Sequence, residues 1–337
     1  MKRLKIGING FGRIGRAFTR IAVDRGNFDI VAVNTRQTAP DMLAYLLKYD
    51  SVYRTFGKSV EAKEGALIVD GQEIKATQIA EPENIPWDEY GVDVVIEATG
   101  AFTKKPDLQR HKKDGVKYIV LSAPAKDEDT DTVVLGVNDE MLDEKNLCEI
   151  SNASCTTNCV APLFKVIDDN FEIESGFVTT AHAYTSSQSL LDESNKKPDR
   201  SRAAALNIIP ASTGAAKAVA RVIPRLKGKL DGMAIRVPVP TVSFADISTV
   251  VKNATTVDEV NAAFRKAADG PMKGILHYET QPLVSSDYIG SSYSSIYDAN
   301  YTRVLGGTLI KVFGWYDNEW GYSARLVDLV EKLARFV

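Results

Sequence analysis

The chain reads Gly10-Phe11-Gly12-Arg13-Ile14-Gly15 between an apolar run, Leu4–Asn9, and a helical pattern, Arg13–Asp24. Glycines at this spacing allow a tight strand-to-helix turn and let the backbone approach a pyrophosphate closely, which the free N–H groups of a helix N-terminus attract. The motif therefore predicts a dinucleotide site at its three glycines, Gly10, Gly12 and Gly15. The alternative is a glycine-rich turn that serves only to pack the helix on the strand.

Alternating strands and helices are predicted for most of the first 150 residues. The apolar strand candidates are Leu4–Asn9, Ile30–Asn34, Val92–Ala98, Tyr118–Ser122, Val133–Val137 and Cys148–Ser151, with helical patterns at Arg13–Asp24 and Asp41–Leu47. Continuous apolar strands separated by helices indicate a parallel sheet covered on both faces, which is the Rossmann-type, doubly wound α/β fold. The hydrophilic stretch Ser51–Trp87 interrupts the alternation, and we expect short antiparallel strands there with a turn at Asp70-Gly71.

The second half has a different pattern. Longer alternating segments lie at Gly176–Ala183, Met233–Lys252 and Leu309–Tyr316, and amphipathic helices at Thr256–Ala268 and Tyr322–Phe336. They predict an α+β catalytic domain built on a mixed sheet. The polar, turn-rich segment 186–207 is long enough to be a functional loop. We expect a dinucleotide-binding domain of residues 1–154, completed by the C-terminal helix 319–337, and a catalytic domain of residues 155–318.

Composition and charge exclude several classes of protein. The 337 residues exceed what one hydrophobic core usually serves, and the formal net charge of −3 gives no overall attraction to nucleic acid or to an anionic membrane. No apolar run approaches the roughly 18 residues of a membrane helix, and a strand predicted from Leu4 leaves no room for a signal peptide. Three cysteines are too few for a disulfide framework, and they lack the spacing of zinc ligands. We expect a cytoplasmic protein without a metal site.

The end of the second predicted strand carries no carboxylate. Folds of this kind usually place an acid about 20 residues after the glycines to bind the ribose 2′-hydroxyl. Here the chain reads Val33-Asn34-Thr35-Arg36-Gln37-Thr38, an arginine flanked by amide and hydroxyl groups. This set suits a 2′-phosphate, so we predict that Asn34, Thr35 and Arg36 contact the cofactor and that NADP is favoured, with NAD possible. The alternative is that Arg36 is a solvated loop charge and NAD binds through neutral contacts.

Two further strand ends are candidate cofactor contacts. Thr99-Gly100 follows the predicted strand Val92–Ala98, and Ser122-Ala123 lies at the end of the predicted strand Tyr118–Ser122. Because ligands bind at the carboxyl ends of parallel strands, we expect Thr99, Gly100 and Ser122 near the cofactor. Ordinary loop chemistry would give the same residues.

Cys155 is the candidate nucleophile. It lies in Ser151-Asn152-Ala153-Ser154-Cys155-Thr156-Thr157-Asn158-Cys159, between a strand and a helical run at Cys159–Asp169. At or near a helix N-terminus the dipole and free amides stabilise a thiolate, and neighbouring hydroxyls can cap the helix or bind an oxyanion. Cys159 follows one turn later, and we expect it to point into the core.

Three histidines could supply an imidazole base. His111 lies in a charged run, which we interpret as solvated, and nothing polar beside His277 in the sequence would orient it. His182 ends an apolar strand and precedes a hydroxyl-rich loop, which is the best position for a base that pairs with Cys155. A capped core histidine would have the same pattern, so spacing alone leaves both interpretations open.

Several separated segments carry a resemblance to a known family. They are Ile8–Gly15, Leu47-Lys48-Tyr49-Asp50-Ser51, Ser151–Cys159, His182-Ala183-Tyr184-Thr185, Ser212-Thr213-Gly214-Ala215-Ala216, Arg236-Val237-Pro238 and Trp315–Tyr322. With these motifs in this order, the chain resembles the glyceraldehyde-3-phosphate dehydrogenases from end to end.

The resemblance implies a role for each matching residue. Cys155 would attack the aldehyde, and His182 would take its proton and then assist hydride and acyl transfer. The inorganic phosphate site would consist of Ser154, Thr156, Thr213 and Gly214. The substrate's own phosphate would bind Thr185 and Arg236, with Arg200 or Arg202 nearby. Further cofactor contacts would come from Arg13, Ile14, Lys75, Ser122 and Asn318, the last of which would hold the nicotinamide carboxamide.

The implied activity is conversion of D-glyceraldehyde 3-phosphate, inorganic phosphate and NAD(P) to 1,3-bisphosphoglycerate through a cysteine thioester, in glycolysis, gluconeogenesis or carbon fixation. The resemblance also implies a homotetramer. One alternative is an erythrose-4-phosphate dehydrogenase, which is less favoured because both phosphate sites are recognisable. Another is a dinucleotide-binding interaction protein without catalysis. A hydroxy-acid dehydrogenase would need no nucleophilic thiol.

Overall fold

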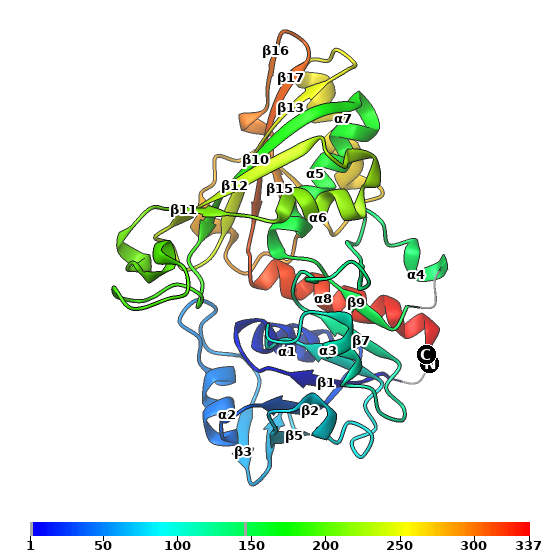
Figure 1. Cartoon of the computed structure of the whole chain (residues 1–337), viewed down its shortest axis with the longest axis vertical. Coiled ribbons are helices and arrows are strands. Elements are labelled where there is room, and N and C mark those ends of the chain that lie inside the picture. Colours follow the sequence, from blue (N-terminus) through cyan, green and yellow to red (C-terminus); the bar gives the residue numbers. More distant parts are fainter. Residues whose placement is uncertain (1–2, 145–146) are drawn as a thin grey trace. The chain divides into compact units, whose positions relative to one another are not determined.

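The computed structural model describes residues 3–144 and 147–337, which form two compact units (Figure 1). The first unit consists of the residues up to Val133, Asp139–Ala153 and Ser323–Val337, and the second of Val134–Asn138 and Ser154–Tyr322. None of the helices in the described ranges has the length and apolar character needed to span a lipid bilayer.

A nine-stranded sheet runs through the described part of the first unit in the order β3-β4-β5-β2-β1-β6-β7-β9-β8. The strands are β1 (Lys5–Asn9), β2 (Asp29–Thr35), β3 (Val60–Lys63), β4 (Ala66–Val69), β5 (Gln72–Gln78), β6 (Val94–Glu97), β7 (Tyr118–Leu121), β8 (Asp131–Thr132) and β9 (Glu149–Ser151). Among the described strands of this sheet, only β3–β4 and β4–β5 pair in antiparallel fashion, and β1 lies between β2 and β6. The predicted Rossmann-type sheet is therefore confirmed, with its change of strand order at β1, where such folds bind ligands.

The helices of this unit begin and end at local signals. They are α1 (Arg13–Arg25), α2 (Pro40–Lys48), α3 (Lys105–Gln109), α4 (Met141–Glu144) and most of α8 (Trp320–Leu333), with short 3₁₀ turns η1 (Pro82–Asn84) and η7 (Ala334–Phe336). Helix α1 ends where Gly26 adopts the left-handed conformation. The predicted turn between β4 and β5 is also present, since Asp70 (φ 50°) and Gly71 (φ 81°) both have the positive φ of a type I′ hairpin.

One predicted strand, Val133–Val137, is wrong. The strand here is the short β8, and the chain turns directly after it. Asn138 accepts a hydrogen bond from the Val134 amide through its side-chain oxygen at 2.8 Å, and Gly136 has a φ of 80°. A side-chain acceptor that captures a nearby amide competes with strand pairing, so an apolar run with strand propensity becomes a turn.

The second unit has a mixed sheet in the order β11-β12-β10-β13-β17-β15-β14, with β16 paired to β17 (Figure 1). The strands are β10 (Ile173–Ala183), β11 (Ile209–Ser212), β12 (Leu230–Val237), β13 (Ser243–Val251), β14 (Leu276–Glu279), β15 (Ser295–Asp298), β16 (Arg303–Leu305) and β17 (Leu309–Tyr316). The pairs β10–β12 and β14–β15 are parallel and the others antiparallel, so the predicted mixed sheet is confirmed. The predicted segment Met233–Lys252 is two strands, because Pro238 and Pro240 lack the N–H group that a ladder needs.

Three longer helices belong to this unit. They are α5 (Cys155–Phe171), α6 (Ala215–Val222) and α7 (Val257–Asp269), accompanied by the 3₁₀ turns η2 (Pro198–Ser201), η3 (Ala204–Leu206), η4 (Pro224–Leu226), η5 (Ser285–Tyr288) and η6 (Ala299–Tyr301). Helix α5 packs against β13, β15 and β17 and contacts α6 and α7. Helix α7 begins with a capping box in which the Thr256 side chain accepts from the Glu259 amide and the Glu259 side chain accepts from the Thr256 amide.

Candidate active site

The turn from β1 to α1 has little room for side chains. Gly10 has a φ of 97°, and a Cβ atom on Gly15 would lie 2.3 Å from the Gly10 carbonyl oxygen. A Cβ atom on Gly12 would meet nothing within 4 Å, and Gly12 begins α1 without a side-chain cap. The first amides of α1 are therefore not occupied by a capping side chain, and open space lies beside the Gly12 Cα. This loop fits the pyrophosphate of a dinucleotide.

At the end of β2 some side chains are hydrogen-bonded within the protein and others are exposed to solvent. The Asn34 amide group donates to the Asn9 side chain and the Ile79 carbonyl, and its oxygen accepts from Thr77 and the Ile79 amide. Because all of its hydrogen-bond positions are used by the protein, the Asn34 side chain is not free to bind a cofactor. Thr35 forms a turn with Thr38, whereas Arg36 is exposed and forms no hydrogen bond or ion pair with the residues that the structure describes.

A buried carboxylate, Glu97, lies at the end of β6. It accepts hydrogen bonds from the Asn9 side chain at 2.6 Å and from the Thr99 amide at 2.8 Å, and it also bonds the Thr99 hydroxyl. Its other partner is His111, whose Nε2 lies 3.0 Å away, while His111 Nδ1 accepts from the Trp87 indole N–H. The interpretation of His111 as solvated is wrong, because this ring is fully buried. The Thr99 hydroxyl is likewise held by the protein.

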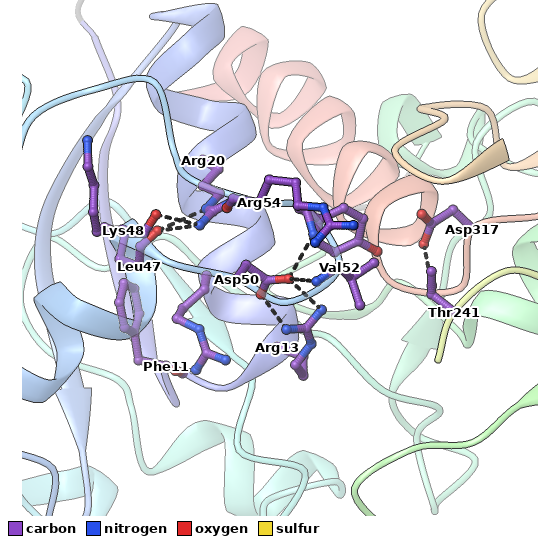
Figure 2. A network of polar contacts seen from close by, with 12 residues as sticks. Phe11, Arg13, Arg20, Leu47, Lys48, Asp50, Val52, Arg54, Thr241 and Asp317 are labelled. Carbon is purple, nitrogen blue, oxygen red and sulfur yellow. Dashed lines mark hydrogen bonds and ion pairs between the residues drawn. The ribbon is translucent and has the colours of Figure 1, made fainter. Parts of the chain in front are cut away.

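The remaining predicted cofactor residues of this unit have the following partners. Arg13 is paired with Asp50, which also accepts from the amides of Val52 and Tyr53 (Figure 2). Lys75 is half exposed and pairs with Glu73 at 2.7 Å. Ile14 and Ser122 are partly buried and Gly100 is exposed. Arg13 can therefore contact a ligand only while it shares its charge with Asp50.

Cys155 is the first residue of α5. Ser154 caps the helix by accepting the Thr157 amide at 3.0 Å, and Ala153 precedes it with a φ of 54°. A thiol at this position receives the positive end of the helix dipole. Cys159, one turn later, is fully buried as expected, and burial raises its pKa to about 12.

The Cys155 Sγ atom lies 3.5 Å from His182 Nε2. His182 is the next-to-last residue of β10, and its Nδ1 lies 2.7 Å from the Ala183 carbonyl oxygen. Since a carbonyl oxygen can only accept, Nδ1 carries the proton and the Nε2 lone pair faces the thiol. The imidazole is thus oriented to accept the proton of Cys155.

Arg236 in β12 is the register partner of His182 across the parallel pair β10–β12. Its Nη1 donates to the same Ala183 carbonyl at 2.8 Å, which brings Nη1 within 2.7 Å of His182 Nδ1. Its Nε atom is buried and has no hydrogen-bond partner among the described residues. A buried cation with an unused donor is the expected state of an anion site before its ligand binds.

The pKa values follow from this arrangement. Burial, and then the charge of Arg236, lower the pKa of His182 to about 3. Burial also raises the pKa of the Cys155 thiol above its ordinary value, while the charge of Arg236 and hydrogen bonds at Thr156 act in the opposite direction. The position at the helix start is therefore not enough to ionise Cys155. The expectation from the sequence considered only the stabilising helix dipole and not the burial that raises the pKa of the thiol. At neutral pH the imidazole is uncharged and able to act as a base.

Polar residues from the loop after β10 accompany Arg236. The Thr185 hydroxyl lies 2.9 Å from the Ser187 hydroxyl, and Arg200 donates to Ser187 at 3.0 Å. The charge of Arg200 also lowers the pKa of Arg236, after burial as the larger cause. Arg202 instead pairs with Asp192 at 2.8 Å. Of the two arginines that the resemblance suggested, Arg200 is the one that shares Ser187 with Thr185 and whose charge affects Arg236.

The other predicted phosphate residues lie at two helix starts. Thr213 accepts the Ala215 amide at 3.2 Å, and Gly214 precedes α6 without a side-chain cap. Thr156 lies 2.9 Å from the buried Tyr316 hydroxyl, which in turn lies 2.8 Å from Thr180. Because Thr180 donates to the Phe244 carbonyl, the proton order runs from Thr156 to Tyr316 to Thr180. In this arrangement the Thr156 hydroxyl donates to Tyr316, so it can donate to a bound anion only by exchanging this bond.

Asn318 follows β17 and is almost fully buried. Its side-chain oxygen accepts a hydrogen bond from the Ser243 hydroxyl at 3.0 Å. The neighbouring Asp317 accepts from the Thr241 hydroxyl at 3.1 Å (Figure 2). The segment that carries Asn318 is thus held by the start of β13 and the residues before it.

Comparison with known proteins agrees with this geometry. Residues 154–318 match the family model described as the glyceraldehyde 3-phosphate dehydrogenase C-terminal domain, and residues 4–105 the NAD binding domain of the same enzyme. The chain is 52% identical over 325 residues to glyceraldehyde-3-phosphate dehydrogenase 1 of Bacillus cereus, covering 96% of this chain and 97% of the relative. It is 53% identical over 328 residues to the Streptomyces coelicolor enzyme, with 97% of each chain covered. The Geobacillus stearothermophilus enzyme is 51% identical, with 98% of each covered.

The chain belongs to the glyceraldehyde-3-phosphate dehydrogenase family. The N-terminal match is to an NAD binding domain, so the cofactor of this family member is a nicotinamide dinucleotide. The dinucleotide loop and the Cys155–His182 pair lie within the two matched ranges.

Sequence reasoning missed four polar residues near these sites in the glyceraldehyde-3-phosphate dehydrogenase fold. They are Glu97, Ser187, Ser243 and Tyr316. Glu97 ends an apolar strand, which is a signal that could have been used, because a carboxylate buried in a sheet needs specific partners. His277 also has a polar neighbour, Glu279 at 3.5 Å, which the sequence analysis did not consider.

Proposed function

We propose that this chain oxidises D-glyceraldehyde 3-phosphate with inorganic phosphate and a nicotinamide dinucleotide, forming 1,3-bisphosphoglycerate through a thioester on Cys155. The observation that carries the proposal is the 3.5 Å approach of the thiol to His182 Nε2, with Arg236 beside the imidazole. A thiol nucleophile, a neutral base and a buried cation are the groups that acyl transfer on a phosphorylated aldehyde requires.

Bond formation begins at the sulfur. Cys155 adds to the aldehyde carbon, and its proton passes to His182 Nε2. The bound nicotinamide supplies a hydride acceptor. His182 would return this proton to the former aldehyde oxygen and take it back when the carbon gives up its hydride, which leaves a thioester. An oxygen of inorganic phosphate then attacks the thioester carbonyl, the C–S bond breaks, and the sulfur regains a proton from His182. Because the pKa of His182 is lowered to about 3, the ring starts each cycle uncharged.

We propose two anion sites for this reaction, one for the phosphate of the substrate and one for inorganic phosphate. Thr185, Arg200 and Arg236 would bind the phosphate of the substrate. This is supported by Ser187, which bonds both Thr185 and Arg200, by the effect of the Arg200 charge on the pKa of Arg236, which is lowered mainly by burial, and by the unpaired Nε atom of Arg236. Inorganic phosphate would bind Ser154, Thr156, Thr213 and Gly214, of which Ser154 and Gly214 lie at helix N-termini.

NADP is the proposed preferred cofactor. Thr35 ends β2, where an acid would bind a free ribose 2′-hydroxyl, and Arg36 is exposed beside it. An unpaired guanidinium at this position favours a 2′-phosphate. Further proposed contacts are Arg13, Ile14, Thr99, Gly100, Ser122 and Asn318, with Lys75 on the adenine side.

Kinetics with both cofactors tests the proposal. We expect turnover of D-glyceraldehyde 3-phosphate to need inorganic phosphate, to be lost in Cys155→Ala and to show a higher kcat/KM with NADP than with NAD. Thr35→Asp should reverse the cofactor order, since a carboxylate repels a 2′-phosphate and binds a 2′-hydroxyl. Several-fold higher kcat/KM with NAD in the unmodified chain would refute the cofactor preference. Faster turnover of erythrose 4-phosphate would refute the substrate.

Assembly and location complete the proposal. Exposed apolar side chains on and near β10 and the loop that follows it support a homotetramer: Phe177, Leu190, Leu191, Leu206 and Ile208. Cys148, Cys155 and Cys159 are all free, which supports a cytoplasmic location. Light scattering at several concentrations would test the assembly.

A further inference from the structure

Ser243 lies between the strand that carries His182 and the residue proposed to hold the nicotinamide. It is the first residue of β13 and is 1% exposed. Its hydroxyl accepts a hydrogen bond from the Ala183 amide at 3.0 Å and lies 3.0 Å from the side-chain oxygen of Asn318. One hydroxyl thus connects the end of β10 with the residue that follows β17.

The direction of these two hydrogen bonds follows from the donors present. The Ala183 amide can only donate, so it occupies a lone pair of the Ser243 oxygen. The single proton of Ser243 is then free for Asn318, and only the carbonyl oxygen of that side chain can accept it. The Asn318 amide group is therefore held in one of its two orientations. Its nitrogen has no hydrogen-bond partner among residues 3–144 and 147–337, although the side chain is almost fully buried.

The residue before Ser243 adds a second observation. Val242 has a φ of 65° and is buried, a left-handed conformation that is strained for a β-branched side chain. Such strain persists where the surrounding contacts determine the backbone. Here Thr241 bonds Asp317 and Ser243 bonds Asn318, so the strained residue lies between two anchors to the segment after β17.

We infer that Ser243 is a positioning residue for the cofactor, one that fixes the Asn318 amide so that its NH₂ group donates to the carbonyl oxygen of the nicotinamide carboxamide. The inference rests on the proposed use of a nicotinamide dinucleotide and adds the residue that orients its reactive ring. If Ser243 loses its hydroxyl, the Asn318 amide can rotate and present its oxygen, which the carboxamide oxygen cannot bond.

Binding without turnover tests the inference. Calorimetry would compare NADP⁺ with 2′-phospho-ADP-ribose, which lacks only the nicotinamide, and NAD⁺ with ADP-ribose. We expect Ser243→Ala to weaken the binding of both dinucleotides about fivefold to tenfold, the effect of losing one oriented neutral hydrogen bond. The affinities for 2′-phospho-ADP-ribose and ADP-ribose should change less than twofold. Equal effects on the ligands with and without nicotinamide would overturn the inference.

Three further variants separate orientation from general damage. Ser295→Ala removes another fully buried serine of the same sheet, whose hydroxyl lies 3.7 Å from Cys159, and should leave all four affinities unchanged. Ser243→Thr and Ser243→Val have nearly the same volume, so the hydroxyl alone should make the threonine variant bind NADP⁺ more tightly. If Ser243→Ala is too unstable to purify, the comparison of these two variants still tests whether the hydroxyl is needed for NADP⁺ binding. Equal binding by the two variants would contradict a role for the hydroxyl.

A double-mutant cycle identifies the partner. In an Asn318→Ala background the further change Ser243→Ala should cause no additional loss of dinucleotide affinity, since the amide to be oriented is absent. A full additional loss would show that Ser243 acts through Ala183, which contradicts the inference. If the unmodified chain binds neither dinucleotide, the proposed function and the inference both fail. If it binds them and Ser243→Ala changes nothing, only the inference fails.

Discussion

Arg236 Nη1 lies 2.7 Å from His182 Nδ1, and both nitrogens donate to the Ala183 carbonyl oxygen. Two N–H donors held this closely repel each other, and the charge of Arg236 contributes, after burial, to the low pKa of His182. An anion that binds Arg236 offsets this charge. The state of the base is therefore expected to depend on whether an anion occupies the proposed phosphate site.

The first prediction concerns that coupling. We expect saturating sulfate to raise the pKa of His182, because a bound anion reduces the effect of the Arg236 charge on the imidazolium. The chain has only three histidines, so NMR of a ¹³C-histidine-labelled sample can follow the ring directly. Chloride at equal ionic strength is the control. In Arg236→Leu the pKa should start higher and no longer respond to sulfate; a sulfate response in this variant would contradict the coupling.

The second prediction concerns stability and pH. The pKa of His182 is lowered to about 3 in the folded chain, below the 6.5 of an exposed histidine. Between these values the unfolded state binds a proton that the folded state does not, so this group makes stability fall as pH decreases below 6.5. Relative to His182→Asn, the unmodified chain should lose about 1.4 kcal/mol per pH unit between roughly pH 6 and 4. Urea unfolding at several pH values measures this difference, which should be constant above pH 7.

The third prediction concerns the two cysteines of α5. Cys159 is fully buried and its pKa is raised to about 12, whereas Cys155 is partly exposed beside a base. Iodoacetamide should modify Cys155 at least about tenfold faster in the native protein, as peptide mapping by mass spectrometry can show. Burial raises the pKa of Cys155 and the charge of Arg236 partly opposes this effect, so Arg236→Leu should move the alkylation profile to higher pH. Similar rates at the two cysteines, or a shift to lower pH, would be evidence against this arrangement.

The fourth prediction separates the roles of the glycines. A methyl group on Gly15 would lie 2.3 Å from the Gly10 carbonyl oxygen, so Gly15→Ala should lower the free energy of unfolding by about 2 kcal/mol or more. Gly12→Ala meets no atom within 4 Å and should fold normally while losing dinucleotide affinity, since its methyl group occupies the space proposed for the pyrophosphate. Urea unfolding and calorimetry on both variants provide the comparison. Normal cofactor binding by Gly12→Ala would place the pyrophosphate elsewhere.

Local sequence patterns predicted the elements that position the candidate site. Strand β17 has the predicted bounds, Leu309–Tyr316, and α1 differs from its prediction by one residue. Both are long periodic segments bounded by glycine or polar residues, so the pattern within the segment determines the element. The position of Cys155 at a helix start followed in the same way from the hydroxyl-rich residues before an apolar run.

Contacts between distant residues could not be predicted in this way. The buried bond between Asn9 and Glu97 joins residues 88 positions apart. The charged neighbours of His111 suggested exposure, yet the turn after α3 places the ring against Trp87 and Glu97. The low pKa of His182 likewise results from burial and then from the charge of Arg236, which is 54 positions away. The charge and polarity of neighbouring residues in the sequence describe a segment as a whole, so they do not show that one side chain within it is buried.

The pairing of β10 with β12 has a consequence for how this protein can vary in evolution. His182 and Arg236 are opposite each other in that ladder, so an insertion or deletion of one residue in either strand would turn one of the two side chains to the opposite face of the sheet. The loop between Ser186 and Asn207 forms no strand pair, although backbone hydrogen bonds join Ser189 to Arg200 and Glu193 to Ser201. We therefore expect changes in chain length to be tolerated in the exposed part of this loop, away from Ser187 and Arg200, and not in the two strands, even at strand positions that never contact a ligand.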